Sequence, residues 1–409
     1  MPILLPEDMN LPLPKMYDVR QTFPRKRLED VADEVRWQIT KNEIFQQLAP
    51  GMNVAIAVGS RGIKNLFEIV KTVVESVQVI KAKPFILSAM GSHGGGTEQG
   101  QKEILRSYGI TSEALGVPVI TNMEVVHLGK TSQGVDVYFD KVAMNADLII
   151  PINRIKLHTD FAYEVQSGLC KMLAIGLGNH IGCTAMHEVP LDSFGKTIME
   201  SASIILRKAP VGFGFAIVEN AYDETAVIEA IHRGGIIYRE KELLKISCDN
   251  MPRLMIPEID VLTVDEIGKN ISGAGFDPNI LGKSYILKEF TLPVPKISRM
   301  VLNNISKQSH GNALGMGVFD VITKNVFEQL DYESMYANAI ASKTIDDAKI
   351  PIIAADEDEA LRIAIKVLSG VAREDLKIVK IKNTLELENI QVSESLLDYV
   401  RGHPSLKLL

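Results

Sequence analysis

The chain has 409 residues, long enough for two or three domains, because one hydrophobic core rarely organises so many residues. Hydrophobic residues make up 46% of it and the formal net charge is −7, a composition typical of a compact globular protein. This acidic balance argues against nucleic acid as a main partner. No apolar run is long enough to span a bilayer, no signal peptide is recognisable, and three cysteines without a CxxC pair suit a reducing compartment. We therefore expect a cytoplasmic protein without a membrane partner.

Short apolar runs alternate with amphipathic stretches in the first half of the chain. Apolar runs end in turn residues, whereas the intervening segments have helical spacing of apolar side chains. Continuous apolar strands alternating with helices predict a parallel sheet with helices on both faces. The expected strands cover residues 54–58, 84–90, 117–121 and 146–153, and the expected helices cover residues 66–77 and 98–109.

A second series of α/β units begins near residue 257. Its expected strands cover residues 259–264, 316–323, 350–356 and 376–383, and a helix is expected over residues 357–368. Residues 392–400 have helical spacing, which suggests a terminal helix that packs back on the first domain. The fold class is therefore α/β, with two α/β domains whose parallel-type sheets are flanked by helices. We expect one domain of residues 1–257 plus 385–409, and another of residues 258–384.

The motif GSRG at residues 59–62 follows an expected strand and precedes an expected helix. Backbone N–H groups at such a junction bind anions, and Arg61 adds a bidentate donor for phosphate or carboxylate. An ordinary turn with a solvated cation would explain the same residues. The motif is neither GxGxxG nor GxxxxGK[ST], so a nicotinamide enzyme or an NTPase lacks its usual support.

The loop GSHGGG at residues 91–96 places His93 among residues almost bare of side chains. Three consecutive glycines allow a ligand to approach the backbone closely, at an entropic cost that a plain turn need not incur. A histidine in this setting has little packing to do, which favours a catalytic role over a structural one.

His158, Lys171 and His187 lie within thirty residues of one another. Two imidazoles and one amine can supply a metal ligand, a general base and a nucleophile. The alternative is that three polar residues lie on the surface around a core strand. Cys170, directly before Lys171, could be reactive but is more simply a buried thiol.

The loop at residues 268–273 carries Lys269 at the end of a strand in the second domain. Lys269 could hold an anionic substrate, or it could pair locally with Asp265 and Glu266, and the residues alone do not separate these interpretations. His310 lies in a polar turn and could support the site indirectly. The remaining histidines lack supporting context and are expected to be structural or solvated: His127, His180, His232 and His403.

Four of these motifs, in this order, resemble the nickel-dependent lactate racemase superfamily. They are GSRG, AMGSHGGGTEQG, SGLCK followed sixteen residues later by a histidine, and DEIGKNISGAGFDPN. The resemblance spans most of the chain and implies two α/β domains with the active site between them. It also implies a nickel-pincer nucleotide, a pyridinium mononucleotide whose ring carbon and two sulfur-containing arms bind nickel. In that family a histidine supplies the fourth nickel ligand, and a lysine can hold one arm covalently.

The resemblance assigns roles to individual residues. Lys171 matches the lysine that holds the cofactor, and His187 matches the nickel ligand. His93 and His158 match the catalytic acid/base pair. Arg61 and Lys269 match residues that orient the substrate carboxylate. The full set of expected cofactor-contacting residues is Lys171, Ser60, Arg61, Gly94 and Gly95.

Other positions depart from the family pattern. The usual DxTRP reads VGSRG at residues 58–62, and the spacing from His158 to Lys171 is a few residues longer than usual. Glu266 replaces a glutamine that contacts substrate, and the single tryptophan, Trp37, lies too early to match the family's substrate-site aromatic. Because a site that hydrogen-bonds hydroxyls selects substrates that carry them, these changes favour a polar 2-hydroxy acid such as an aldonate. Lactate or another short 2-hydroxy acid is the alternative.

The resemblance implies inversion at C2 by reversible hydride transfer to the cofactor. One histidine would take the hydroxyl proton of each stereoisomer, and a planar 2-keto acid would lie between them. Cofactor-biosynthesis proteins would be transient partners, and a homo-oligomer is possible. Three rival functions remain: a zinc hydrolase, a nicotinamide dehydrogenase, and a non-catalytic carrier of hydroxy acids.

Overall fold

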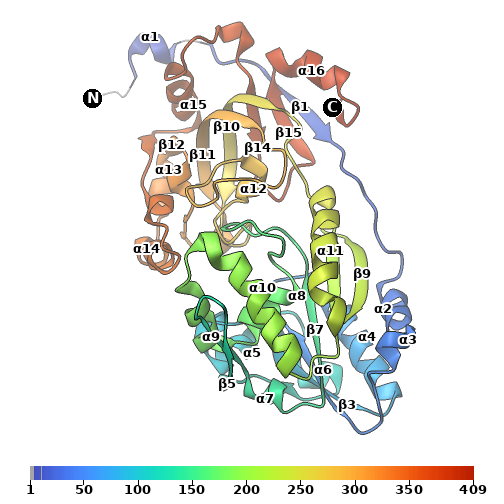
Figure 1. The fold of residues 1–409 in the computed structure, drawn as a ribbon. Helices are drawn as coiled ribbons and strands as arrows, with labels where there is room; N and C mark the ends of the chain where they lie inside the picture. The colour runs from blue at the N-terminus through green and yellow to red at the C-terminus, as the bar shows by residue number, and fades with distance from the viewer. Residues whose placement is uncertain (1–3, 11) are drawn as a thin grey trace. The chain divides into compact units, whose positions relative to one another are not determined.

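The structure is a computed structural model that describes residues 4–10 and 12–409. The chain divides into two compact units. Unit 1 comprises Met1–Phe23 and Pro252–Leu409, and unit 2 comprises Pro24–Met251. Both are visible in Figure 1, where the blue-to-green segment forms most of unit 2. Within the described part of the chain, no helix is both long enough and apolar enough to cross a membrane.

Unit 2 is built on a six-stranded sheet in the order β4-β3-β2-β7-β8-β9. All neighbouring pairs are parallel except β8 and β9, which are antiparallel. A separate hairpin consists of β5 (Val125–Lys130) and β6 (Asp136–Asp140). The strands of the main sheet are β2 (Asn53–Val58), β3 (Lys83–Ser88), β4 (Val119–Ile120), β7 (Leu148–Arg154), β8 (Phe213–Glu219) and β9 (Thr225–His232).

The helices of unit 2 connect these strands and cover the sheet (Figure 1). They are α2 (Val31–Thr40), α3 (Asn42–Phe45), α4 (Leu66–Val79), α5 (Glu98–Ser107), α6 (Ser112–Leu115), α7 (Lys141–Met144), α8 (Leu169–Lys171), α9 (Asn179–His187), α10 (Leu191–Lys208) and α11 (Ile236–Asn250). A π-helical turn, Met172–Gly176, follows α8 directly.

The two faces of this sheet differ in side-chain size. Alternate strand residues such as Ile56, Ile150 and Phe215 pack with α2 and α4 in one large apolar core. Small residues occupy positions on the other face, where the absent side chain of Gly214 leaves room for Leu169 of α8. Since successive strand residues point to opposite faces, this asymmetry lets α8 approach the strands closely.

Unit 1 contains an eight-stranded mixed sheet in the order β13-β12-β11-β10-β14-β15-β1-β16. The first five are parallel, and the remaining pairs are antiparallel. The strands are β1 (Met16–Gln21), β10 (Glu258–Ile267), β11 (Lys296–Ile305), β12 (Val321–Thr323), β13 (Ile352–Ala354), β14 (Ile378–Ile381), β15 (Asn389–Ser393) and β16 (Leu406–Leu408). The helices are α1 (Pro6–Met9), α12 (Pro278–Leu281), α13 (Lys324–Glu328), α14 (Tyr332–Ala341), α15 (Glu357–Lys366) and α16 (Leu397–Gly402).

The structure confirms the α/β class and the parallel strands flanked by helices, but the units differ from the expected domain bounds. Residues 385–409 belong to unit 1, as do the residues up to Phe23. The physical reason is strand pairing: β1 lies between β15 and β16, and Val19 and Val392 are fully buried in the sheet. The expected helix over residues 392–400 begins instead as the end of β15, and α16 starts at Leu397.

We predict that Phe213→Ala lowers the free energy of unfolding of unit 2 by about 3–5 kcal/mol, because this fully buried β8 side chain would leave a cavity. Urea unfolding followed by Trp37 fluorescence and circular dichroism measures the change, since Trp37 lies on α2 of the same unit. Val79→Ala, at an 82% exposed position, serves as control and should change stability by less than about 0.5 kcal/mol. An unchanged midpoint for Phe213→Ala would contradict the packing described here.

Candidate active site

Three loops of unit 2 leave the same edge of its sheet. Ser60 and Arg61 follow β2, the glycine-rich loop at 91–96 follows β3, and His158 lies beyond the end of β7. Because β2, β3 and β7 are parallel, their carboxyl ends meet at one edge. This is the edge at which open α/β sheets bind ligands.

His93 is tied to the loop that follows β2. Its Nδ1 atom shares a short hydrogen bond with Ser60 Oγ. The Tyr108 hydroxyl donates to the Ser60 carbonyl oxygen at 2.7 Å, and the buried Gln101 amide donates to the carbonyl oxygen of Gly91 at 3.0 Å. Burial, followed by the positive charge of Arg61, lowers the pKa of His93 to about 4. His93 is therefore neutral at physiological pH, with Nε2 as the ring nitrogen that Ser60 does not engage.

The three glycines after His93 occupy their positions for different structural reasons. Gly94, Gly95 and Gly96 all have left-handed φ values, of 66°, 67° and 63°. A Cβ at Gly94 would overlap with the backbone of Gly100, whereas a Cβ at Gly95 would meet no atom within 4 Å. The backbone at Gly95 can thus be approached by a ligand. Gly96 lies against the His180 ring, so His180, expected from the sequence to be structural or solvated, borders this loop.

His158 and Lys171 form a direct pair, with His158 Nε2 2.6 Å from Lys171 Nζ. The backbone N–H of Asp160 donates to His158 Nδ1 at 3.1 Å, which places the lone pair of the neutral ring on Nδ1 and its proton on Nε2. The Nε2–H group then needs a lone pair as its acceptor, and only an uncharged amine has one. We conclude that the Lys171 amine is neutral in this arrangement.

The electrostatic surroundings of Lys171 favour the uncharged amine far more than water does, and this form predominates above about pH 8. Burial lowers its pKa to about 8, and the positive charges of Arg61 and Lys156 act in the same direction, whereas Asp160 opposes them. Burial likewise lowers the pKa of His158 well below its ordinary value. An uncharged lysine amine is a nucleophile, so the arrangement is suited to covalent attachment of a group at Lys171.

The segment that carries Lys171 has unusual helical geometry. Lys171 ends α8, and in the π-helical turn that follows, the N–H of Leu177 donates to the carbonyl oxygen of Met172 at 2.8 Å. Such turns are rare and occur frequently at functional sites. The missing side chain of Gly59 leaves room for Met172, and the missing side chain of Gly176 leaves room for the Ala89 carbonyl. These close contacts seat the turn directly on β2 and β3.

His187, at the end of α9, has a fixed ring orientation. Its Nδ1–H donates to the carbonyl oxygen of Cys183 at 2.7 Å, which leaves Nε2 as the nitrogen that can coordinate a metal ion. A hydrogen bond with the Cys183 thiol raises the pKa of His187. The same thiol donates to Ser92 Oγ at 3.3 Å and so connects α9 to the residue before His93.

Aromatic rings connect the two imidazoles. The His158 ring lies 4.5 Å from that of Phe161, Phe161 lies 5.1 Å from Phe194, and Phe194 lies 5.2 Å from His187. Sequence reasoning missed both phenylalanines, because Phe194 has the helical spacing of an ordinary core residue and Phe161 lies in a loop. An apolar wall of this kind lowers the local dielectric and strengthens the effect of nearby charges.

The structure thus brings together five of the residues singled out from the sequence. The lowered pKa of His93 includes contributions from Arg61, Lys171 and His187, and that of His158 includes the same three groups. Their placement at one sheet edge is observed, and their catalytic and binding roles stay predictions.

The two predicted residues of unit 1 lie together at the carboxyl end of β10. Glu266 accepts a hydrogen bond from Asn383 at 3.0 Å, and the Lys269 amine donates to the carbonyl oxygen of Gly273 at 2.7 Å. The Lys269 backbone N–H donates to Ser309 at 3.0 Å. Neighbouring Asp265 pairs with Lys380 at 3.1 Å. The proposed substrate contacts of Glu266 and Lys269 stay predictions.

The other histidines have local partners. His127 pairs with Asp136 at 2.7 Å on the β5–β6 hairpin, and both His232 and His403 accept a backbone N–H at 3.2 Å. These contacts agree with structural roles. His310, which has a left-handed φ of 49°, directly follows Ser309, the residue that holds the Lys269 backbone.

The side chains near the candidate site suit a metal ion that is already bound to a cofactor. Among the described residues, no group of three or more His, Cys, Asp or Glu side chains converges in a way that could hold a metal ion. A catalytic zinc site with three protein ligands therefore has no support in these residues. His187 offers one oriented imidazole, Lys171 one neutral amine, and Arg61 an exposed guanidinium for phosphate, which together suit a nucleotide-borne metal.

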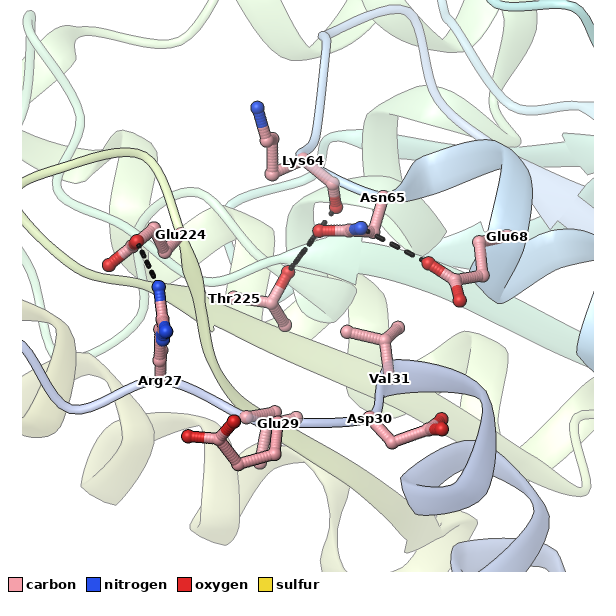
Figure 2. Close-up of a pocket in the computed structure, with 10 residues that line it drawn as sticks. Arg27, Glu29, Asp30, Val31, Lys64, Asn65, Glu68, Glu224 and Thr225 are labelled. Atoms are coloured by element: carbon pink, nitrogen blue, oxygen red, sulfur yellow. Dashed lines mark hydrogen bonds and ion pairs between the residues drawn. The ribbon is translucent and has the colours of Figure 1, made fainter.

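A hollow of about 310 Å³ elsewhere in unit 2 contains none of the predicted catalytic residues (Figure 2). It lies between the starts of α2 and α4 and the turn before β9. Lys64 and Asn65 reach it from the loop after β2, and Thr225 contacts both of them (Figure 2). Its lining is Arg27, Leu28, Glu29, Asp30, Val31, Lys64, Asn65, Glu68, Glu224 and Thr225.

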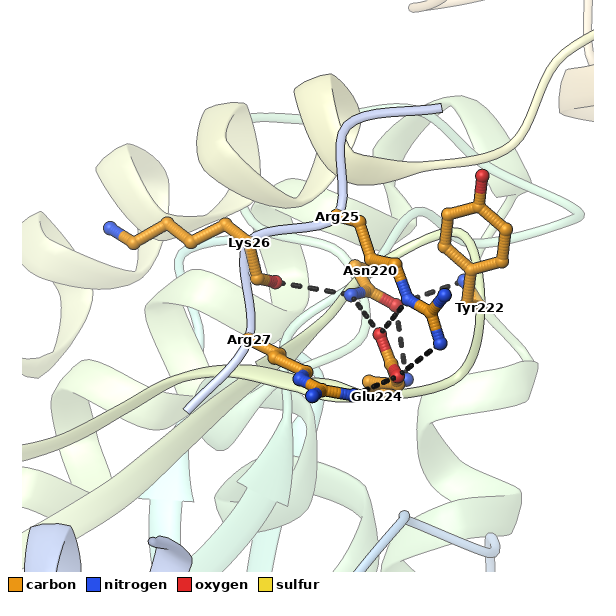
Figure 3. Close-up of polar contacts among 6 residues, drawn as sticks. All are labelled: Arg25, Lys26, Arg27, Asn220, Tyr222 and Glu224. Atoms are coloured by element: carbon orange, nitrogen blue, oxygen red, sulfur yellow. Dashed lines mark hydrogen bonds and ion pairs between the residues drawn. The ribbon is translucent and has the colours of Figure 1, made fainter. Parts of the chain in front are cut away.

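One side of this hollow is an ion cluster (Figure 3). Arg25 and Arg27 both pair with Glu224, at 2.8 and 3.1 Å, and hydrogen bonds from Arg25 and Asn220 lower the pKa of Glu224 to about 2. The Arg25 guanidinium also lies over the Tyr222 ring. These pairs anchor the first residues of unit 2 to the β8–β9 turn, which is a structural role.

Residues 10–197 match the family model described as the lactate racemase N-terminal domain. No curated protein matches the sequence. Among solved structures, the lactate racemase apoprotein from Thermoanaerobacterium thermosaccharolyticum has a similar fold, with a TM-score of 0.55 and 13% sequence identity. That match covers 91% of this chain and 99% of the other.

We predict that the Lys171 amine titrates near pH 8. At limiting reagent, the rate of its acetylation by N-hydroxysuccinimidyl acetate should level off above about pH 9, because the amine is by then uncharged. Peptide mass spectrometry measures the rate, and Lys71, a half-exposed lysine of α4, is the internal control. A Lys171 profile that parallels Lys71 would contradict the neutral pair with His158.

Proposed function

We propose that the chain is a racemase or epimerase of the lactate racemase superfamily, because residues 10–197 match the model of its N-terminal domain and the fold resembles that of a lactate racemase apoprotein. The reaction is inversion of the C2 stereocentre of a 2-hydroxy acid, with a nickel-pincer nucleotide as cofactor. The observation that supports this most directly is the neutral Lys171–His158 pair, which shares one sheet edge with His93 and His187.

In this proposal the residues of unit 2 hold the cofactor. Lys171 would hold one of its arms, and His187 would coordinate its nickel through Nε2. Arg61, Ser60 and the backbone at Gly94 and Gly95 contact the nucleotide, with proteins of cofactor biosynthesis as transient partners. When bound, the group supplies a reversible hydride acceptor for C2.

The chain's own residues orient the substrate and move its hydroxyl proton. Arg61 binds the carboxylate and removes rotational freedom before reaction. His93, neutral and held by Ser60 at Nδ1, accepts the hydroxyl proton of one stereoisomer at Nε2. His158 serves the mirror-image substrate, since inversion at one carbon requires a base on each side.

The pair with Lys171 adds a condition to the role of His158. Its Nε2 atom faces the lysine amine. Covalent attachment at Lys171 would remove the lone pair to which Nε2–H donates, and would so leave the Nε2–H group of His158 to donate its proton to the substrate oxygen. His158 would then act as the acid opposite the base His93, and as a base in the reverse direction, only in protein that carries the cofactor, whereas His93 would be available in either state.

The substrate we propose is a polar 2-hydroxy acid, with an aldonate such as gluconate as the first candidate. Glu266 is an acceptor for substrate hydroxyls, and a site that hydrogen-bonds hydroxyls rejects analogues that lack them. Lactate and other short 2-hydroxy acids are the alternative substrates, and a non-catalytic carrier of hydroxy acids is the alternative function.

We predict that nickel-loaded protein, purified after co-expression with the cofactor-biosynthesis enzymes, inverts C2 of a polar 2-hydroxy acid. His93→Ala and His158→Ala should each lower kcat by about a hundredfold or more, because each removes a proton-transfer group. His127→Ala, which removes an exposed histidine of the β5–β6 hairpin, is the matched control and should leave kcat unchanged.

The reaction is run in heavy water on a panel of 2-hydroxy acids that includes lactate and gluconate. Chiral chromatography then measures which of them are inverted. Inversion without deuterium at C2 supports hydride transfer, whereas deuterium at C2 would contradict it. Turnover of lactate alone would contradict the polar substrate. Substrate binding without inversion by the loaded protein would favour the carrier.

We predict that kcat/KM of the loaded enzyme stays nearly constant from pH 7.5 to pH 5.5. Burial lowers the pKa of His93 to about 4 and that of His158 well below its ordinary value, so both bases stay neutral in this range. An unperturbed histidine would lose about tenfold in its neutral fraction by pH 5.5. Initial rates, with circular dichroism as a check on folding, measure the profile, and a midpoint near pH 6.5 would contradict the burial of these rings.

A further inference from the structure

A carboxyl group lies buried beneath the turn that carries Lys171. It belongs to Glu240 of α11, whose side chain is fully buried, and the proposed catalysis assigns it no role. Glutamate is almost never fully buried unless it is paired. A buried glutamate next to a candidate site therefore needs a physical explanation.

Glu240 accepts a hydrogen bond from the start of α8. Its Oε2 atom lies 2.8 Å from the backbone nitrogen of Cys170, the residue directly before Lys171. The first N–H groups of a helix lack intrahelical partners, and the residue that precedes α8, Gly168, supplies no side-chain cap. Glu240 thus caps this turn from a different helix.

The residues next to this contact leave room for it and support it. A Cβ at Gly168 would overlap with Glu240 Oε1 and with Ile155, so only glycine leaves room for the carboxyl group. On the other side of the same peptide, the Asn153 amide donates to the Gly168 carbonyl oxygen at 2.7 Å. The turn is therefore held from β7 through Asn153 and from α11 through Glu240.

The buried carboxyl group of Glu240 is not expected to stabilise the folded chain. Oε1 of Glu240 has no hydrogen-bond partner of ordinary geometry in the described residues, although the Leu169 N–H and the Cys170 thiol lie close to the carboxyl group, and burial raises the pKa of this group to about 7. A well-packed apolar side chain at such a position is often as stable or more stable. A costly group that holds one particular turn points to a requirement for the position of that turn.

We propose that Glu240 is a positioning residue: it fixes the first turn of α8 so that the Lys171 amine stays against His158 Nε2. The significance of this role for catalysis rests on the proposed function of Lys171. The geometric claim can be tested without cofactor, because it concerns only the state of one amine in the purified chain.

The test is the pH dependence of Lys171 acetylation in Glu240→Gln and Glu240→Leu. Glutamine keeps an oxygen acceptor for the Cys170 N–H, so its profile should match that of the unchanged protein. Leucine fills similar space without an acceptor, so the amine should leave His158 and its midpoint should move from about 8 toward the ordinary value of 10.5. At pH 7.5 the labelling rate should fall by about tenfold or more.

Two further variants separate loss of the Glu240 contact from misfolding or general destabilisation of unit 2. Gly168→Ala pushes the same carboxyl away while Glu240 is retained, so it should shift the Lys171 midpoint in the same direction and decides the matter if Glu240→Leu does not fold. Val73→Ala weakens unit 2 from the other face of the sheet and should leave the Lys171 profile unchanged. Unchanged profiles in both Glu240→Leu and Gly168→Ala would overturn the proposal.

A second measurement separates this proposal from the proposed function. In cofactor-loaded protein, the mass added to the Lys171 peptide should be lower for Glu240→Leu than for Glu240→Gln. If the acetylation profiles shift as described but no variant gains mass or activity, the positioning role stands and the proposed cofactor chemistry fails. If loading is normal in Glu240→Leu and its acetylation profile is unchanged, the positioning role fails alone.

Discussion

The site depends on one hydrogen bond, between His158 Nε2 and Lys171 Nζ at 2.6 Å. An ordinary lysine is charged at neutral pH and surrounded by water. Here the Asp160 N–H directs the His158 proton to Nε2, and burial beside Arg61 and Lys156 lowers the pKa of the Lys171 amine to about 8, so that the uncharged form becomes accessible. The pair turns a common surface residue into a nucleophile, and the proposed chemistry follows from that change.

The sheet of unit 2 makes this pair possible through small residues at its edge and on one face. Gly59 and Gly176 allow the π-helical turn to lie on the strands, and Gly214 allows Leu169 of α8 to do the same. The parallel direction of β2, β3 and β7 then brings the loops of Arg61, His93 and His158 to one edge. The backbone geometry alone therefore brings the loops of the candidate site together.

Much of this could be predicted from the sequence where the signal is local. The strand-to-loop pattern around residues 59–62 and 91–96 indicated a parallel sheet, and the close spacing of His158, Lys171 and His187 indicated a site. What could not be predicted depends on distant pairing. The antiparallel contacts of β1 with β15 and β16 join the ends of the chain, and no periodicity records which strand pairs with which. The same limit applies to Glu240, whose helical spacing in α11 does not reveal that it caps a turn seventy residues earlier.

The protonation state of the His158–Lys171 pair is the most direct measure of this account. Nitrogen chemical shifts of ¹⁵N-labelled protein, with His158→Gln and Lys171→Met for assignment, report the protonated atoms at pH 8.5. We expect His158 to carry its proton on Nε2, Nδ1 to be unprotonated, and Lys171 to have the shift of a neutral amine. A protonated Nδ1 together with an ammonium shift for Lys171 would contradict it.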